Sequence, residues 1–256
     1  MQEFILKDNI TRMRYHDFPG NGTPILFIHG LGCAGSFDYP QVAAQVELCE
    51  NRRILVDLLG SGFSDKPENF GYRVSDHAEY LADFVSYLDL EEFILFGHSL
   101  GGAVALDLAD RCKDRLKKII LSESNLDSGG GTTSRAIASY DEVEFLHHGF
   151  KNIILESRES GNEMWAASFS VCAPRAMHRI SRSAVKGETP SWREILYSLK
   201  CPRTYIFGEK SLPDPDMQIL SEQGIHIELV NNAGHSMAWD NPKGLALAIK
   251  NGLMEE

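Results

Sequence analysis

The chain lacks the long apolar runs and the basic excess that mark several large protein classes. None of its 256 residues lies in an apolar run of the roughly 20 residues that span a bilayer, and residues 1–11 contain no long apolar core of a signal peptide. Its 25 Lys and Arg residues are outnumbered by 36 Asp and Glu residues, and the formal net charge is −11. Such a charge repels nucleic acid and anionic membrane surfaces. We therefore expect a soluble, cytoplasmic protein without nucleic-acid or membrane partners.

Paired cysteines, internal repeats and low-complexity segments are also missing. The five cysteines are an odd number, are widely spaced and form no C-x-x-C pair. Neither a disulfide framework nor a zinc site is indicated, and we expect no metal and no organic cofactor. The five are Cys33, Cys49, Cys112, Cys172 and Cys201.

Short β-like runs alternate with helical patterns over most of the chain. This alternation predicts an α/β protein with a mostly parallel, doubly wound sheet, and 43% hydrophobic residues are enough for a sizeable core. The expected strands, the first two forming a hairpin, lie at residues 4–6, 13–15, 25–28, 54–56, 93–96, 119–121, 204–207 and 225–230. The expected helices lie at residues 39–49, 75–88, 100–111 and 241–252.

One segment, residues 126–192, breaks this alternation. It contains no convincing strand, and its helix-like patterns carry several large apolar residues, among them Trp165 and Phe169. We expect a helical cap inserted into a core made of residues 1–125 and 193–256. Open α/β sheets bind ligands at their strand ends, and the cap is expected to pack over that edge.

The pentapeptide Gly97-His98-Ser99-Leu100-Gly101 follows an apolar strand and precedes a helical pattern. This is the context of a nucleophile elbow, a turn so tight that glycine is needed on both sides and the serine hydroxyl is exposed. A serine hydroxyl is a weak nucleophile near neutral pH and needs a base within hydrogen-bond reach. His235 follows the last expected strand in a glycine-containing loop and is the best candidate for that base.

Together these motifs resemble the α/β-hydrolase superfamily, and within it serine esterases with a helical cap. The resemblance covers nearly the whole chain and implies that Ser99 is the nucleophile, His235 the base, and the backbone N–H groups of Leu31 and Leu100 the oxyanion hole. It rests on the elbow, on Gly234-His235, and on the motifs His29-Gly30-Leu31-Gly32 and Gly60-Ser61-Gly62-Phe63-Ser64-Asp65.

The acidic member of the triad departs from the common family pattern. Many relatives carry an aspartate where this chain has Ser211, on the loop after the penultimate strand. Two other carboxylates are candidates for the acidic member of the triad. Glu123 follows the strand one step earlier, as in certain haloalkane dehalogenases, and Asp214 lies further along the usual loop between two prolines. We favour Glu123, since the flanking prolines restrict how the Asp214 loop can turn.

These residues predict a serine hydrolase that cleaves a carboxylic ester or thioester of a small to medium acyl group through an acyl-enzyme. Dehalogenases and epoxide hydrolases of this family use an aspartate in the elbow, whereas aminopeptidases and carbon–carbon bond hydrolases keep a serine and remain alternatives. A second alternative is a small-molecule sensor with little or no turnover on the same fold. The natural substrate, the acyl length and the oligomeric state stay open.

Overall fold

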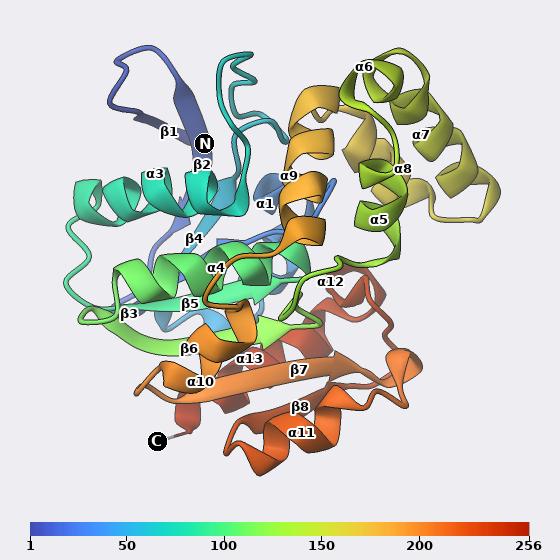
Figure 1. Ribbon diagram of the computed structural model, residues 1–256. Coiled ribbons are helices and arrows are strands. Elements are labelled where there is room, and N and C mark those ends of the chain that lie inside the picture. Colours follow the sequence, from blue (N-terminus) through green and yellow to red (C-terminus); the bar gives the residue numbers. More distant parts are fainter. Residues whose placement is uncertain (256) are drawn as a thin grey trace.

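The computed structural model describes residues 1–255 and contains one eight-stranded sheet with helices on both faces (Figure 1). The strand order is β1-β2-β4-β3-β5-β6-β7-β8. The pairs β1–β2 and β2–β4 are antiparallel, and all other neighbours are parallel. The strands are β1 (Gln2–Ile5), β2 (Arg12–Phe18), β3 (Gly22–Ile28), β4 (Asn51–Asp57), β5 (Phe93–His98), β6 (Leu116–Ser122), β7 (Arg203–Gly208) and β8 (His226–Val230).

The central strands are buried on both faces, which explains their continuous apolar sequences. Successive side chains of β3 point to opposite sides of the sheet. Leu26 and Ile28 join the core under α3 and α4, whereas Ile25 and Phe27 join the core under α2 and α13. The expected α/β class with a doubly wound, mostly parallel sheet is therefore confirmed.

Three of the four expected helices cover the sheet as predicted. Two of the expected helices are reproduced closely as α3 and α4, and the last begins at Pro242 as α13. The outer helical elements are α1 (Gly35–Asp38), α2 (Pro40–Ala43), η1 (Val46–Leu48), α3 (Val74–Tyr87), α4 (Leu100–Arg111), α10 (Trp192–Ser198), η3 (Glu209–Ser211), α11 (Asp216–Glu222), α12 (Met237–Asp240) and α13 (Pro242–Met254).

The expectation of one helix over residues 39–49 is wrong. That stretch holds α2 and η1, separated by Gln45, whose backbone is extended. The break lets Val42 and Leu48 both enter the core beneath α13, where each is fully buried. Tertiary burial therefore overrides the helical pattern of this segment.

All elements between β6 and β7 are helical. Apart from α10, which packs against α4, they gather at one end of the sheet, as the yellow-green to gold part of Figure 1 shows. Trp165 anchors them there, because its indole N–H donates a hydrogen bond of 2.8 Å to the carbonyl of Leu31 on the loop after β3. Before α10 these elements are α5 (Thr132–Ala138), α6 (Glu142–Glu144), η2 (Phe145–Gly149), α7 (Phe150–Glu159), α8 (Glu163–Ser170) and α9 (Pro174–Lys186).

Two further expectations concern membranes and cysteines. Within residues 1–255, no helix combines the length and the apolar character needed to cross a membrane. All five cysteines are free thiols.

Gly101 connects the fold to the site, because α4 approaches the end of β3 at this residue. A Cβ atom there would lie 2.2 Å from the carbonyl oxygen of His29, a backbone atom that cannot rotate away. We expect Gly101→Ala to lower the free energy of unfolding by about 2–3 kcal/mol, the upper part of the range for overpacking. Chemical denaturation measures this loss.

Gly131→Ala is the control, because a Cβ atom there meets nothing closer than 4.0 Å. It changes only the residue that precedes α5, and its expected loss stays below about 1 kcal/mol. Equal losses in the two variants would contradict the close approach at Gly101.

Candidate active site

Ser99 occupies a sharp turn between β5 and α4. Its backbone has φ 53° and ψ −126°, a conformation that L-residues rarely adopt and that marks stored strain. Two hydrogen bonds of 2.9 Å hold the turn, one from Ser99 N–H to the carbonyl of Ser122 and one from Gly102 N–H to the carbonyl of Ser99. The hydroxyl is thereby presented at the start of α4, where the helix dipole favours negative charge.

Ser99, His235 and Glu123 form one continuous chain of hydrogen bonds. His235 Nε2 lies 3.0 Å from Ser99 Oγ, and His235 Nδ1 lies 2.7 Å from Glu123 Oε2. An ionised carboxylate only accepts hydrogen bonds, so Nδ1 carries the proton of the neutral ring and Nε2 is left to accept from the serine. The hydroxyl therefore faces a free ring nitrogen that can take its proton.

Glu123 comes directly after β6, the strand beside the elbow. Burial raises the pKa of its carboxyl, but hydrogen bonds from His235, the Ser211 hydroxyl and the Gly208 N–H outweigh that effect and hold the pKa at about 2. The bond from Gly208 measures 2.9 Å. Glu123 is therefore ionised near neutral pH.

Ser211 stands where many relatives carry the acid, and its role was missed by the sequence argument. Its hydroxyl donates a hydrogen bond to Glu123 instead of contacting His235 as a carboxylate would. The only sequence signal was its position on the loop after β7.

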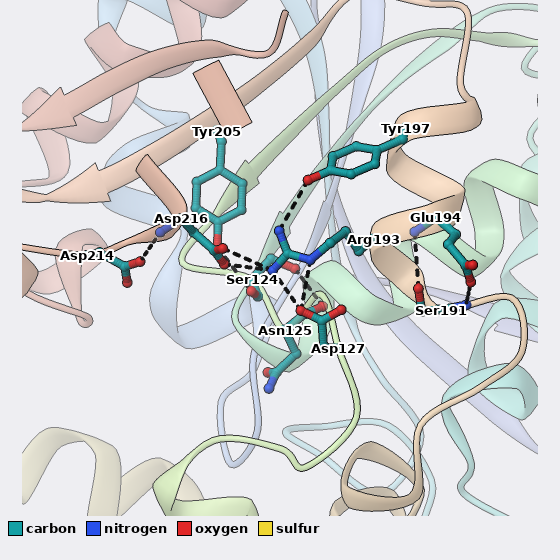
Figure 2. A network of polar contacts seen from close by, with 10 residues as sticks. All are labelled: Ser124, Asn125, Asp127, Ser191, Arg193, Glu194, Tyr197, Tyr205, Asp214 and Asp216. Atoms are coloured by element: carbon teal, nitrogen blue, oxygen red, sulfur yellow. Dashed lines mark hydrogen bonds and ion pairs between the residues drawn. The ribbon is translucent and has the colours of Figure 1, made fainter. Parts of the chain in front are cut away.

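Asp214, the alternative acid, is engaged elsewhere. Figure 2 shows its carboxylate directed at the start of α11, where it accepts the backbone N–H of Asp216 at 2.8 Å. Asp216 pairs with Arg193 at 2.9 Å, and Arg193 also binds Asp127 at 2.6 Å. Among residues 1–255, His235 receives its carboxylate contact from Glu123 and makes no hydrogen bond with Asp214.

The two backbone N–H groups expected to form an oxyanion hole flank the serine. Leu100 is the first residue of α4, and the first N–H groups of a helix have no partner within it. The peptide between Gly30 and Leu31 lies beside the serine, because a Cβ atom on Gly30 would lie 3.1 Å from Ser99 Cβ.

His29 fixes the orientation of this peptide. Its Nε2 accepts the N–H of Leu58 at 3.0 Å, so its Nδ1 carries the proton and donates to the carbonyl of Gly30 at 2.8 Å. Desolvation lowers the pKa of His29 and keeps the ring neutral. Since C=O and N–H of a trans peptide point in opposite directions, the N–H of Leu31 is turned away from His29.

His98 precedes Ser99 at the end of β5, and its ring centre is 4.7 Å from that of His235. Its Nδ1 lies 2.8 Å from the Ser122 hydroxyl. Desolvation and the neighbouring His235 lower the pKa of His98 to about 3. A neutral His98 places no positive charge beside His235.

Two hollows meet at Ser99. One, of about 450 Å³, extends along α1 and α12 toward Asp38 and Trp239. The other, of about 500 Å³, extends past Glu123 toward Ser134 of α5. Both are lined in part by residues of the helical segment between β6 and β7, including Asn162 and Trp165. Within residues 1–255 no group of His, Cys, Asp or Glu side chains is arranged to hold a metal ion.

Comparison with known proteins shows what the chain and its fold are similar to. Residues 23–145 match the model of the alpha/beta hydrolase fold. The structure is similar to a thermophilic esterase from Thermogutta terrifontis over 98% of this chain and 97% of that one, with 21% identity and a TM-score of 0.79. It is also similar to the enol-lactonase from Burkholderia xenovorans LB400 over 99% and 100% of the two chains, with 18% identity and a TM-score of 0.79. The chain therefore has the α/β-hydrolase fold and is similar to proteins of that superfamily.

Curated relatives share shorter segments with this chain. Haloalkane dehalogenase 2 of Mycobacterium tuberculosis is 32% identical over 113 residues, which are 44% of this chain and 38% of the relative. The 2-hydroxymuconate semialdehyde hydrolase of Pseudomonas sp. (strain CF600) is 32% identical over 114 residues, 44% of this chain and 40% of the relative. The matched part thus spans about two fifths of the length of these relatives, which are hydrolytic enzymes by name.

The lowered pKa of Glu123 makes stability depend on pH in a defined direction. The carboxyl titrates near 4.3 in an unfolded chain and at about 2 in the folded protein. Its stabilising contribution is complete above pH ~5 and is lost as the pH falls through 2. Glu123→Gln lacks this term, so the stability difference between wild type and variant shrinks between pH ~5 and ~2.

Urea denaturation of both proteins at several pH values in this window measures the difference. Carboxylates that are present in both proteins contribute equally to the pH dependence of the two unfolding free energies, so their contribution cancels in the difference. A difference that stays constant below pH ~5 would contradict the hydrogen-bonded state of Glu123.

Proposed function

We propose that this protein is a serine hydrolase that cleaves a carboxylic ester or thioester of a small to medium acyl group. The observation that carries the proposal is the unbroken hydrogen-bond chain from Ser99 Oγ through the His235 ring to the Glu123 carboxylate, with distances of 3.0 and 2.7 Å. This order of nucleophile, base and acid is that of acyl-transfer hydrolases.

In the first half-reaction, Ser99 Oγ attacks the carbonyl carbon while its proton moves to His235 Nε2. The carbonyl oxygen becomes an oxyanion, stabilised by the N–H groups of Leu31 and Leu100. Glu123 stabilises the imidazolium that forms and does not itself take the proton. Collapse of the intermediate breaks the bond to the alcohol or thiol, which leaves with the proton from His235 and gives an acyl-enzyme.

In the second half-reaction, water takes the place of the alcohol. His235 accepts a proton from the water as its oxygen attacks the acyl carbon. Collapse of the second intermediate releases the carboxylic acid and returns the proton to Ser99. The exposure of the His235 side chain, 55%, supports water access to the base.

We further propose that residues 126–192 act as a cap on the core made of residues 1–125 and 193–256. Trp165 lines both hollows next to Ser99, and its indole N–H holds the loop that carries Leu31. A segment in this place shapes the substrate space and leaves the chemistry to the core. The substrate is then a small molecule that enters between the two parts.

The nucleophile and base are tested together with a fluorophosphonate probe and a p-nitrophenyl acetate assay. Wild type should be labelled on Ser99 and hydrolyse the ester. Ser99→Ala and His235→Ala should lose labelling and lower kcat by about 10⁴ or more, because the two groups act as one unit. A non-catalytic sensor would show neither labelling nor turnover, and a variant with more than a tenth of wild-type activity would overturn the assignment.

The acid is tested by a matched pair of isosteric substitutions. Glu123→Gln should lower kcat by about two to four orders of magnitude, since the amide cannot stabilise the imidazolium. Asp214→Asn should stay within about tenfold of wild type, because its carboxylate serves the start of α11. Steady-state kinetics of folded variants decides the ranking, and the reverse order would move the acid to the loop after β7.

A further inference from the structure

The hollow beside Ser99 contains a buried carboxylate that the proposed chemistry does not use. Asp38 ends α1 and lines this hollow, although only 7% of its surface is exposed. Trp239 Nε1 donates a hydrogen bond of 2.9 Å to Asp38 Oδ1, and the Cys33 thiol donates another. Both donors are uncharged, so they supply the Asp38 carboxylate with hydrogen bonds but not with a counter-ion.

Positive charge is missing from the walls around Asp38. No Lys or Arg lines the hollow in the described part of the chain, and none of the ion pairs among residues 1–255 includes Asp38. Glu163 and Asp240 line the same space and add negative charge. Burial raises the pKa of Asp38, because the charged form loses its hydration, and the hydrogen bonds from Trp239 and Cys33 act in the opposite direction.

The aromatic walls suit a cation as well. Trp239, which is partly exposed, lines the hollow beside Asp38, and ring faces attract ammonium groups. The Tyr39 hydroxyl is buried and has no hydrogen-bond partner within residues 1–255. A buried polar atom without a partner is uncommon and points to a group that is supplied from outside the protein.

We propose that this hollow binds a positively charged amine on the substrate, with Asp38 as the counter-ion. The inference rests on the proposed function, since it assigns the kind of ester that the same site accepts. Folding already removes water from the Asp38 carboxylate. An ammonium group that binds there therefore forms a charge pair without a further desolvation cost for the carboxylate. Met237 and Leu245 supply the apolar floor for the short alkyl part that carries the amine.

The experiment measures binding separately from turnover. n-Butylammonium and 1-butanol, which share an alkyl chain, are titrated into Ser99→Ala at constant ionic strength, and tryptophan fluorescence reports binding because Trp165 and Trp239 line the hollow. We expect the ammonium to bind at least about tenfold more tightly than the alcohol, as a charge-assisted hydrogen bond requires. Equal binding of the two ligands would overturn the inference.

Three substitutions in the Ser99→Ala background locate the preference. Asp38→Asn keeps an acceptor for Trp239 and should reduce the preference to within about twofold. Glu163→Gln also removes one negative charge, but from an exposed position of the lining. This variant should retain the preference for the ammonium, since solvent screens the charge of Glu163. If both variants lost the ammonium preference equally, the preference would come from the summed negative charge of the lining, and the role of Asp38 would be overturned.

Trp239→Arg covers the case in which Asp38→Asn does not fold. Trp239 is 38% exposed, so an arginine is accommodated there and places its own cation beside Asp38. The ammonium preference should then disappear, and its persistence would contradict the pairing. Hydrolysis of p-nitrophenyl acetate by the wild type distinguishes the two proposals: turnover without the preference overturns this inference alone, and the preference without turnover overturns the hydrolase.

Discussion

The hydrogen bond from Ser99 N–H to the carbonyl of Ser122 joins the ends of β5 and β6, and the geometry of the site depends on it. It places the elbow and the residue after Ser122 on adjacent strand ends. Glu123 therefore starts one strand away from Ser99, and both residues have positive φ, at 39° and 53°. His235, on the loop after β8, closes the gap between them. The strain at two neighbouring turns is compensated by the packed sheet beneath them.

Burial and hydrogen bonding decide which groups around the serine are charged. Three donors keep Glu123 ionised, while desolvation keeps His29 and His98 neutral. Each histidine then has a defined set of donors and acceptors. His29 orients the peptide that carries the Leu31 N–H, and His98 supports the turn through Ser122. The result is one ionised carboxylate, one exposed histidine and two neutral histidine rings within a small volume.

Much of this arrangement could be predicted from short sequence patterns, whereas a prediction failed where distant parts of the chain pack together. The elbow was predictable because glycine spacing and the strand before it describe a local conformation. The preference for Glu123 over Asp214 followed from the restrictions that two prolines place on a loop. The single helix over residues 39–49 failed because its apolar pattern does not show that Val42 and Leu48 must enter a core under a helix 200 residues later.

The sequence by itself determined the α/β class, the places of the strands along the chain and the position of the serine in its tight turn, since these follow from periodicity and local backbone limits. The tertiary structure alone decided which carboxylate meets His235, that the Ser211 hydroxyl binds this carboxylate, and that Asp38 faces the hollow beside the serine. These relations join residues from different strand ends and helices. Their distances are set by how the elements pack, and no pattern along the chain records that packing.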